Sequence, residues 1–152
     1  MSLDAPPDYV AYLRALIGPK PVNLVGAAGA VFNAAGELLL QRKVGAGRWT
    51  VPGGNCELGE SFEDALHREV WEETSLMVQA AELLTVVSGE ATFKRLHNGH
   101  EFYRYTALFR VTRWSGTPVP DGLESEELRF FSLDTLPPLA GQVERRLAAL
   151  LR

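Results

Sequence analysis

A glycine followed by a short run of acidic residues is the feature that most constrains what this chain can be. The pattern G-x5-E-x7-R-E-V-x-E-E occupies residues 54–73. Its glutamates Glu69, Glu72 and Glu73 stand at i, i+3 and i+4, which places their carboxylates on one side of a helix. Like charges this close repel one another, and a bound cation relieves the repulsion. Because only oxygen ligands are offered, the pattern favours a hard divalent ion such as Mg2+, with Mn2+ as a substitute.

A Glu-rich segment is more often simply the solvated face of a helix, so the helical phase has to decide between the two interpretations. At about 100° per residue, an apolar stripe forms from Phe62, Leu66 and Val70. Glu69 and Glu73 fall at the edge of this stripe, so both are expected to lean toward the body of the protein. Carboxylates buried in this way need a metal ion or an arginine as partner.

The pattern closely resembles the Nudix box, G-x5-E-x7-R-E-U-x-E-E-x-G-U, in which U is an aliphatic residue. In this chain the box is residues 54–76, and Val70 and Leu76 fill its aliphatic positions. Ser75 stands where the family has glycine. A residue just past a helix end often adopts the left-handed conformation, which costs serine about 1 kcal/mol. Either Ser75 accepts this cost or the turn takes another shape.

The resemblance extends beyond the box, to residues 38–42, 49–54 and 130–137, and covers about residues 22–137. It implies an α/β fold, the Nudix-type α/β/α sandwich with a mixed β-sheet. It also implies a metal-dependent pyrophosphohydrolase that cleaves a nucleoside diphosphate linked to another moiety, or a nucleoside triphosphate. The expected partner is a small nucleotide derivative. No subfamily marker in the sequence selects one substrate.

The family's roles can be placed on the matching residues of this chain. The metal ligands would be Glu69, Glu72, Glu73 and the carbonyl of Gly54. Glu69 would also orient or deprotonate the attacking water, and an ion pair of Arg68 with Glu60 would brace the ligands. Some members take the base from a later loop, where this chain offers Glu124, Glu126 and Glu127.

Substrate contacts are less constrained by the sequence. Arg42 is expected either to meet a phosphate oxygen or to be solvated on an outward strand face. Phe93, Tyr103 and Tyr105 are able to stack on a base, but alternating aromatics on a strand more often belong to the core. Glu124 completes the set of residues assigned to substrate binding.

Three functional interpretations remain open at this point. The intact glutamates favour an enzyme. Ser75 in place of glycine is compatible with a Nudix-fold sensor that binds a nucleotide with little or no turnover. The third interpretation is an unrelated structural protein that binds Mg2+ or Ca2+.

Composition bounds the class of protein. With 152 residues, 46% of them hydrophobic and 22% charged, the chain is expected to form a single domain, 1–152. A net charge of −4 argues against a large nucleic-acid partner. A lone cysteine, Cys56, excludes an internal disulfide and fits the cytoplasm. No apolar stretch approaches the roughly 18 residues of a membrane span, and no signal peptide is evident. A homodimer is left open.

Local patterns predict the order of elements. Residues 1–20 are expected to hold an N-terminal helix (8–17) and its lead-in. Ser61 is the expected cap of the box helix, and Asn98-Gly99 marks a hairpin between 93–95 and 100–111. A Gly/Pro loop is predicted over 114–123. A terminal helix is predicted over 143–151, with Leu147, Leu150 and Leu151 facing inward. The remaining strands are predicted at 22–32, 37–43, 77–88 (one strand or a pair) and 128–133.

Overall fold

The computed structural model describes residues 8–45 and 47–151, and it confirms the predicted alternation of helices and strands. Residues 1–7 of the predicted lead-in lie outside the described residues. The helices are α1 (Tyr9–Ile17), α2 (Phe62–Thr74) and α3 (Gln142–Leu150), with 3-10 turns η1 (Glu90–Thr92) and η2 (Leu133–Thr135). The strands are β1 (Val22–Val31), β2 (Leu38–Lys43), β3 (Trp49–Thr50), β4 (Gly53–Asn55), β5 (Met77–Val87), β6 (Phe93–Arg95), β7 (Glu101–Ser115) and β8 (Ser125–Phe131).

The strands form two sheets. In the larger sheet the order is β4-β1-β7-β5, with β6 also paired to β7. Strands β1 and β7 run parallel and the other pairs are antiparallel, so the predicted mixed sheet is confirmed. A smaller antiparallel sheet, β3-β2-β8, was not anticipated. Strands β3 and β4 are too short to show a sequence periodicity, which explains why they were missed.

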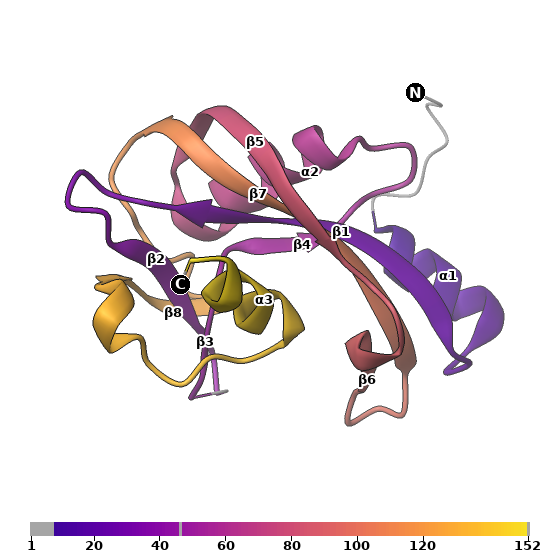
Figure 1. The fold of residues 1–152 in the computed structure, drawn as a ribbon. Coiled ribbons are helices and arrows are strands. Elements are labelled where there is room, and N and C mark those ends of the chain that lie inside the picture. Colours follow the sequence, from indigo (N-terminus) through magenta and orange to yellow (C-terminus); the bar gives the residue numbers. More distant parts are fainter. Residues whose placement is uncertain (1–7, 46, 152) are drawn as a thin grey trace.

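Helices cover both faces of the long strands (Figure 1). Helix α2 packs its apolar side on one face, in a core shared with β1, β5 and β7. Helix α3 and the smaller sheet pack on the other face, around a second core that includes Leu108 and Leu147. This layering confirms the expected α/β/α sandwich. It also leaves the short strand β4 at an edge of the larger sheet, next to α2.

Both ends of α2 form as the sequence predicts. The Ser61 hydroxyl accepts a hydrogen bond from the Asp64 N–H at 3.0 Å, which caps the N-terminus. Ser75 ends the helix in the left-handed conformation, with φ 63° and ψ 15°. Of the two alternatives for this position, Ser75 therefore accepts the strained angle. Phe62 is 39% exposed and does not extend the buried stripe, because burial along α2 begins only at Ala65.

Two predicted boundaries near the C-terminus are wrong. Trp114 belongs to β7 rather than to a loop, because its indole N–H donates to the Phe32 carbonyl at 2.9 Å and holds the strand end in place. The last strand begins at Ser125 instead of residue 128, since it pairs with β2 as far as Lys43 through an irregular step. Glu126 and Glu127 consequently lie within β8 and not ahead of it.

The terminal helix is confirmed, but only part of its predicted inner face is buried. Leu147 is fully enclosed and Leu151 packs partly against the same core. Leu150 is 45% exposed, in contrast to the prediction, because α3 is covered along one narrow side.

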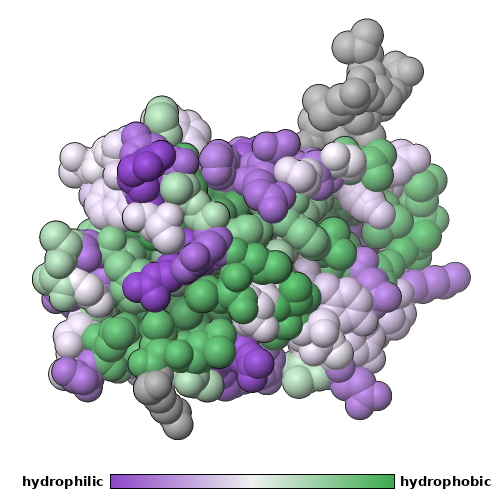
Figure 2. Space-filling model, turned by 45° about the horizontal axis from the view of Figure 1, so that its top comes forward, coloured by the Kyte–Doolittle hydropathy of each residue, from purple (hydrophilic) through white to green (hydrophobic). Residues whose placement is uncertain are grey.

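Apolar side chains also reach the surface. On the face shown in Figure 2, hydrophobic residues form broad patches beside strongly hydrophilic ones. The exposed apolar side chains of β5 include Leu83 and Val86.

Among the described residues, no helix is both long and apolar enough to cross a membrane. A homodimer stays a prediction.

Candidate active site

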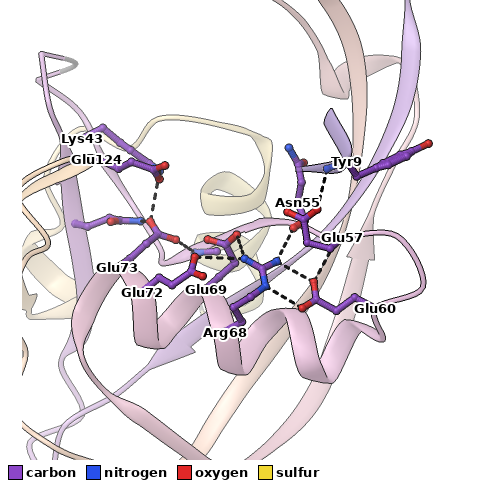
Figure 3. Close-up of polar contacts among 12 residues, drawn as sticks. Tyr9, Lys43, Asn55, Glu57, Glu60, Arg68, Glu69, Glu72, Glu73 and Glu124 are labelled. Carbon is purple, nitrogen blue, oxygen red and sulfur yellow. Dashed lines mark hydrogen bonds and ion pairs between the residues drawn. The ribbon is translucent and has the colours of Figure 1, made fainter. Parts of the chain in front are cut away.

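The acidic residues of the box gather on one side of α2, around a single arginine (Figure 3). Arg68 Nε and Nη2 each donate to a carboxylate oxygen of Glu60 at 2.8 Å. Its Nη1 donates to Glu69 at 2.8 Å and to Glu72 at 3.3 Å, and its Nη2 also reaches the Asn55 carbonyl at 3.0 Å. The predicted ion pair between Arg68 and Glu60 is therefore present, and it extends into a network.

The Arg68 network fixes the charge state of its main partner. The hydrogen bond from Arg68 lowers the pKa of the Glu60 carboxyl below its ordinary value. The same contact with Glu60 raises the pKa of Arg68. Both groups therefore stay ionised at neutral pH. The bidentate ion pair with Glu60 holds the Arg68 guanidinium beside the other carboxylates.

Glu73 is the most deeply buried of the glutamates, with 1% of its surface exposed. Its carboxylate accepts hydrogen bonds from the Gln41 side chain and, at 3.0 Å, from the Gly53 N–H. Lys43 Nζ lies 3.4 Å from it. Burial raises the pKa of Glu73 to about 7, and the nearby Lys43 only partly offsets that effect. The sequence-based expectation that this residue turns toward the protein body is confirmed.

Glu69 lies between Glu73 and Arg68. Burial raises the pKa of Glu69, while its hydrogen bond with Arg68 acts in the opposite direction. Its carboxylate rests directly on Gly54: a Cβ at that position would be 2.5 Å from the Glu69 Cδ. No side chain therefore fits at residue 54 unless Glu69 moves. The carbonyl oxygen of Gly54 lies against Gly26 of β1, and its predicted role as a ligand stays a prediction.

The donor set suits a hard divalent cation. Glu69, Glu72 and Glu73 supply only carboxylate oxygens, and two of them have raised pKa values that a positive ion would relieve. Within residues 8–45 and 47–151, no three acidic, histidine or cysteine side chains already converge as a ligand group. Glu72, whose side chain is 54% exposed, is free to turn. The chemistry of these residues therefore fits a divalent cation. To bind it, the side chains of Glu69 and Glu72, which Arg68 now holds, would have to rearrange.

Other residues predicted to meet substrate lie apart from this cluster. Arg42 pairs with Glu126 and Glu127, each at 3.1 Å, on the outer face of the smaller sheet. The Phe93 and Tyr103 rings pack together with centroids 5.3 Å apart. None of these residues lines the cavity described below.

Among the later glutamates, only Glu124 is placed near the box. Its carboxylate is 3.9 Å from Lys43 Nζ, beside the lysine that also contacts Glu73 (Figure 3). With its side chain 67% exposed, Glu124 is free to move. Glu126 and Glu127 are both paired to Arg42, and Glu127 also contacts Arg129. Glu124 is therefore the one of the three with access to the cluster.

A cavity of about 300 Å3 opens on the other side of β4. Gly53 and Gly54 form part of its wall, so these glycines separate the cavity from the α2 carboxylates. Its polar lining side chains include Lys94 of β6, Arg104 and Thr106 of β7, and Glu144 near the start of α3. The Glu144 carboxylate accepts from the Val51 N–H at 3.2 Å, and burial raises its pKa.

Sequence reasoning missed these cavity residues, although one signal was available. Arg104 and Thr106 stand at alternate positions between Phe102 and Leu108, both of which are buried. Polar residues at alternate positions of an otherwise apolar strand face point into the same layer as their apolar neighbours. Only the fold shows that this layer contains a cavity beside β4.

Comparisons with known proteins agree with this geometry. The NUDIX domain family model matches residues 22–151. A MutT-like protein of Streptomyces ambofaciens is 44% identical over 66 residues, 43% of each chain. An ADP-ribose pyrophosphatase of Methanocaldococcus jannaschii is 33% identical over 110 residues, covering 71% of this chain and 61% of that protein. The chain thus spans about half the length of the curated relatives it matches.

Comparison with solved structures shows that the fold of this chain is similar to that of other NUDIX proteins. The crystal structure of a MutT NUDIX hydrolase from Burkholderia pseudomallei superposes with a TM-score of 0.69 at 30% identity, covering 84% of this chain and 95% of that one. An ADP-ribose pyrophosphatase from Streptococcus suis gives a TM-score of 0.57 at 28% identity, covering 84% and 90%. With a family model that matches most of its length, this chain belongs to the NUDIX domain family.

Proposed function

We propose that this chain is a metal-dependent pyrophosphohydrolase. Its substrate would be a nucleoside diphosphate linked to another moiety, or a nucleoside triphosphate, and its cofactor Mg2+, with Mn2+ as a substitute. The single observation that carries the proposal is the position of the carboxylates of Glu69, Glu72 and Glu73. Those of Glu69 and Glu73 lie against the glycines of β4, Glu72 stands beside them on α2, and the same glycines form part of the wall of a cavity large enough for a small ligand.

In this proposal Glu69, Glu72 and Glu73 hold the metal. When bound, a divalent ion neutralises the charge that develops on the bridging and leaving oxygens of a diphosphate. Water attacks one phosphorus, the bond from that phosphorus to the bridging oxygen breaks, and two phosphate-bearing products leave. Glu69 takes the proton of the attacking water; its raised pKa makes it a better base than an exposed carboxylate. Glu124 is the alternative base, since among the later glutamates it is the one that contacts Lys43, which in turn contacts Glu73.

Arg68 and Glu60 act as positioning residues. The bidentate contact between them fixes the guanidinium, which in turn holds Glu69 and Glu72. Lys43 restrains Glu73 from the other side. The relatives support the activity class, because the similar proteins include an ADP-ribose pyrophosphatase and an oxidized purine nucleoside triphosphate hydrolase of Mus musculus.

A product-release assay tests the proposal. The protein would be incubated with nucleoside triphosphates and nucleoside diphosphate sugars, with Mg2+ and with excess chelator. We expect turnover of at least one compound that stops in chelator. Full turnover in chelator would contradict the metal dependence. Binding without turnover would support a nucleotide sensor instead.

A further inference from the structure

The cavity beside β4 is lined by residues with buried polar atoms that have no hydrogen-bond partner among the described residues. Among the described residues, the buried side-chain atoms without a hydrogen-bond partner include Arg104 Nε, Thr106 Oγ1 and Thr50 Oγ1, and all three residues line the cavity. Buried polar atoms are normally satisfied, by protein, water or ligand. Three of the seven such atoms among the described residues belong to residues that line this one cavity, which favours a polar ligand against this wall.

Of these groups, the Arg104 guanidinium needs the most hydrogen-bond acceptors and is the only one that carries a charge. Its guanidinium lies over the Phe102 ring, 5.0 Å from the centroid, and it makes no ion pair or hydrogen bond with any other described residue. A guanidinium carries five donors in a fixed fork and keeps its charge in proteins. Burial without a counter-charge is unfavourable. Burial lowers the pKa of Arg104, although the charges of the Glu69, Glu144 and Glu73 carboxylates act in the opposite direction from a distance.

The charges around Arg104 show which kind of ligand fits. The cavity is lined by the cationic residues Arg48, Lys94 and Arg104 against one acidic residue, Glu144, and by Lys43, which is itself paired with Glu73 and Glu124. This excess of positive charge occurs in a chain whose net charge is −4. The ligand that complements it is an anion with several oxygens, as a phosphate is.

The position of Glu144 gives the ligand an orientation. Its carboxylate lies at the start of α3, close to Gly141, while Gly53 and Gly54 form the wall toward the α2 carboxylates. An anionic group is repelled from Glu144 and attracted to Arg104. A hydroxyl or amino group suits the Glu144 end, because that carboxylate accepts hydrogen bonds.

We propose that Arg104, supported by the Thr106 hydroxyl, binds a phosphate oxygen of the substrate inside this cavity. The diphosphate then lies across the β4 glycines, with Arg104 on one side and the metal-binding carboxylates of α2 on the other. The proposal rests on the proposed function, because it assigns the non-metal half of the same site. It makes Arg104 a substrate-binding residue that selects for phosphate-bearing ligands over the free nucleoside.

Equilibrium binding tests the proposal without requiring turnover. The probes are α,β-methylene ADP, inorganic pyrophosphate and adenosine, titrated calorimetrically in Mg2+. Arg104→Met should weaken binding of both diphosphates by about tenfold or more, as expected for the loss of hydrogen bonds to a charged group. Adenosine affinity should not change. Arg104→Lys should restore part of the diphosphate affinity, and Thr106→Val should lower it by a smaller factor.

Arg110→Met is the matched control. Arg110 lies on the same strand and also stacks on an aromatic ring, that of Phe32 at 5.1 Å, but it is exposed and does not line the cavity. Its diphosphate binding should equal that of the parent. If Arg104→Met does not fold, Arg104→Lys and Thr106→Val carry the test.

Three results would overturn the proposal. These are unchanged diphosphate affinity in folded Arg104 variants, an equal loss for adenosine, and absence of diphosphate binding by the parent protein. Failure of the proposed function looks different: diphosphates would still bind in an Arg104-dependent way, but no substrate would be turned over.

Discussion

The side chains on the two sides of strand β4 differ in the sign of their charge and in whether the protein supplies partners for them. On the α2 side, acidic groups outnumber cations, and the protein supplies partners for them: Arg68 holds Glu60 and Glu69, and Lys43 meets Glu73. On the cavity side, Arg104 and two threonine hydroxyls are left without partners among the described residues. On the acidic side the protein itself therefore compensates the charges, and the side chains must rearrange to bind a metal. The cavity side instead needs a ligand to supply the missing hydrogen-bond partners.

This difference matters because the two sides share one thin wall. Gly53 donates its N–H to Glu73, Gly54 touches Glu69, and both residues face the cavity. A diphosphate placed across the glycines would meet a metal on one side and Arg104 on the other. The comparison predicts that variants on the acidic side affect chemistry and metal binding, while variants on the cavity side affect which ligand binds.

The largest effect is expected from Glu73→Gln. This change removes a carboxylate proposed to hold the metal, so kcat should fall by about two orders of magnitude or more. The fold should persist, because glutamine keeps an acceptor for the Gly53 N–H and Gln41 has a free Oε1 that can accept from the new amide. Steady-state kinetics at saturating Mg2+ measure the effect.

Glu63→Gln is the control for that variant. Glu63 is exposed on the first turn of the same helix, and among the described residues it makes no hydrogen bond or ion pair with the cluster. Its kcat should match that of the parent. A Glu73→Gln enzyme that retained near-parental rates would show that Glu73 does not bind the metal.

A smaller effect is expected in the pH dependence of stability without metal. Glu73 has a folded-state pKa of about 7, above the ordinary value of 4.5, so the folded protein binds the proton more tightly than the unfolded chain between these values. Its contribution to the free energy of unfolding is therefore complete below pH 4.5 and is lost as pH rises toward 7. The loss amounts to roughly 3 kcal/mol at most.

Denaturant unfolding in chelator between pH 4.5 and 8 measures this dependence. Glu73→Gln should flatten the curve, although Glu69 and Glu144 also have raised pKa values and will leave part of the slope. Added Mg2+ should stabilise the protein more at pH 8 than at pH 5, because it binds the ionised carboxylates. An unchanged slope in Glu73→Gln would refute the assignment of the raised pKa to this residue.

The smallest effect is expected from Ser75→Gly, which lies at the end of α2 and outside both sides of β4. Ser75 has φ 63°, an angle that glycine adopts without strain. The substitution should raise the free energy of unfolding by at most about 1 kcal/mol and Tm by a few degrees. Ser75→Ala keeps the Cβ and should show no such gain. A tenfold change in kcat would instead mean that residue 75 affects the metal geometry.

The acidic side could be predicted from the sequence because its geometry is local. Residues at i, i+3 and i+4 share a helix face whatever the rest of the fold does, so the positions of Glu69 and Glu73 were correctly anticipated. The contact of Arg68 with Glu60, from the loop just before α2, was also anticipated. The capping of α2 by Ser61 is equally local.

The cavity side could not be predicted in this way, because it is assembled from distant segments. Thr50, Arg104 and Glu144 come from three different elements, and only the strand register and the packing of α3 bring them together. The same limit explains the missed strands β3 and β4, whose pairing is decided by long-range contacts rather than by a periodic pattern. The ion pairs of Arg42 with Glu126 and Glu127 also depend on the pairing of distant strands, and its role toward a phosphate stays a prediction.

Direct measurement of Mn2+ binding by electron paramagnetic resonance tests the central claim, that the α2 carboxylates form a cation site before substrate arrives. The parent and Glu63→Gln should bind Mn2+ with equal affinity. Glu72→Gln and Glu73→Gln should each bind it about tenfold or more weakly, and Arg104→Met should not differ from the parent. Equal Mn2+ affinity in all of these proteins, or no binding by the parent, would contradict the account.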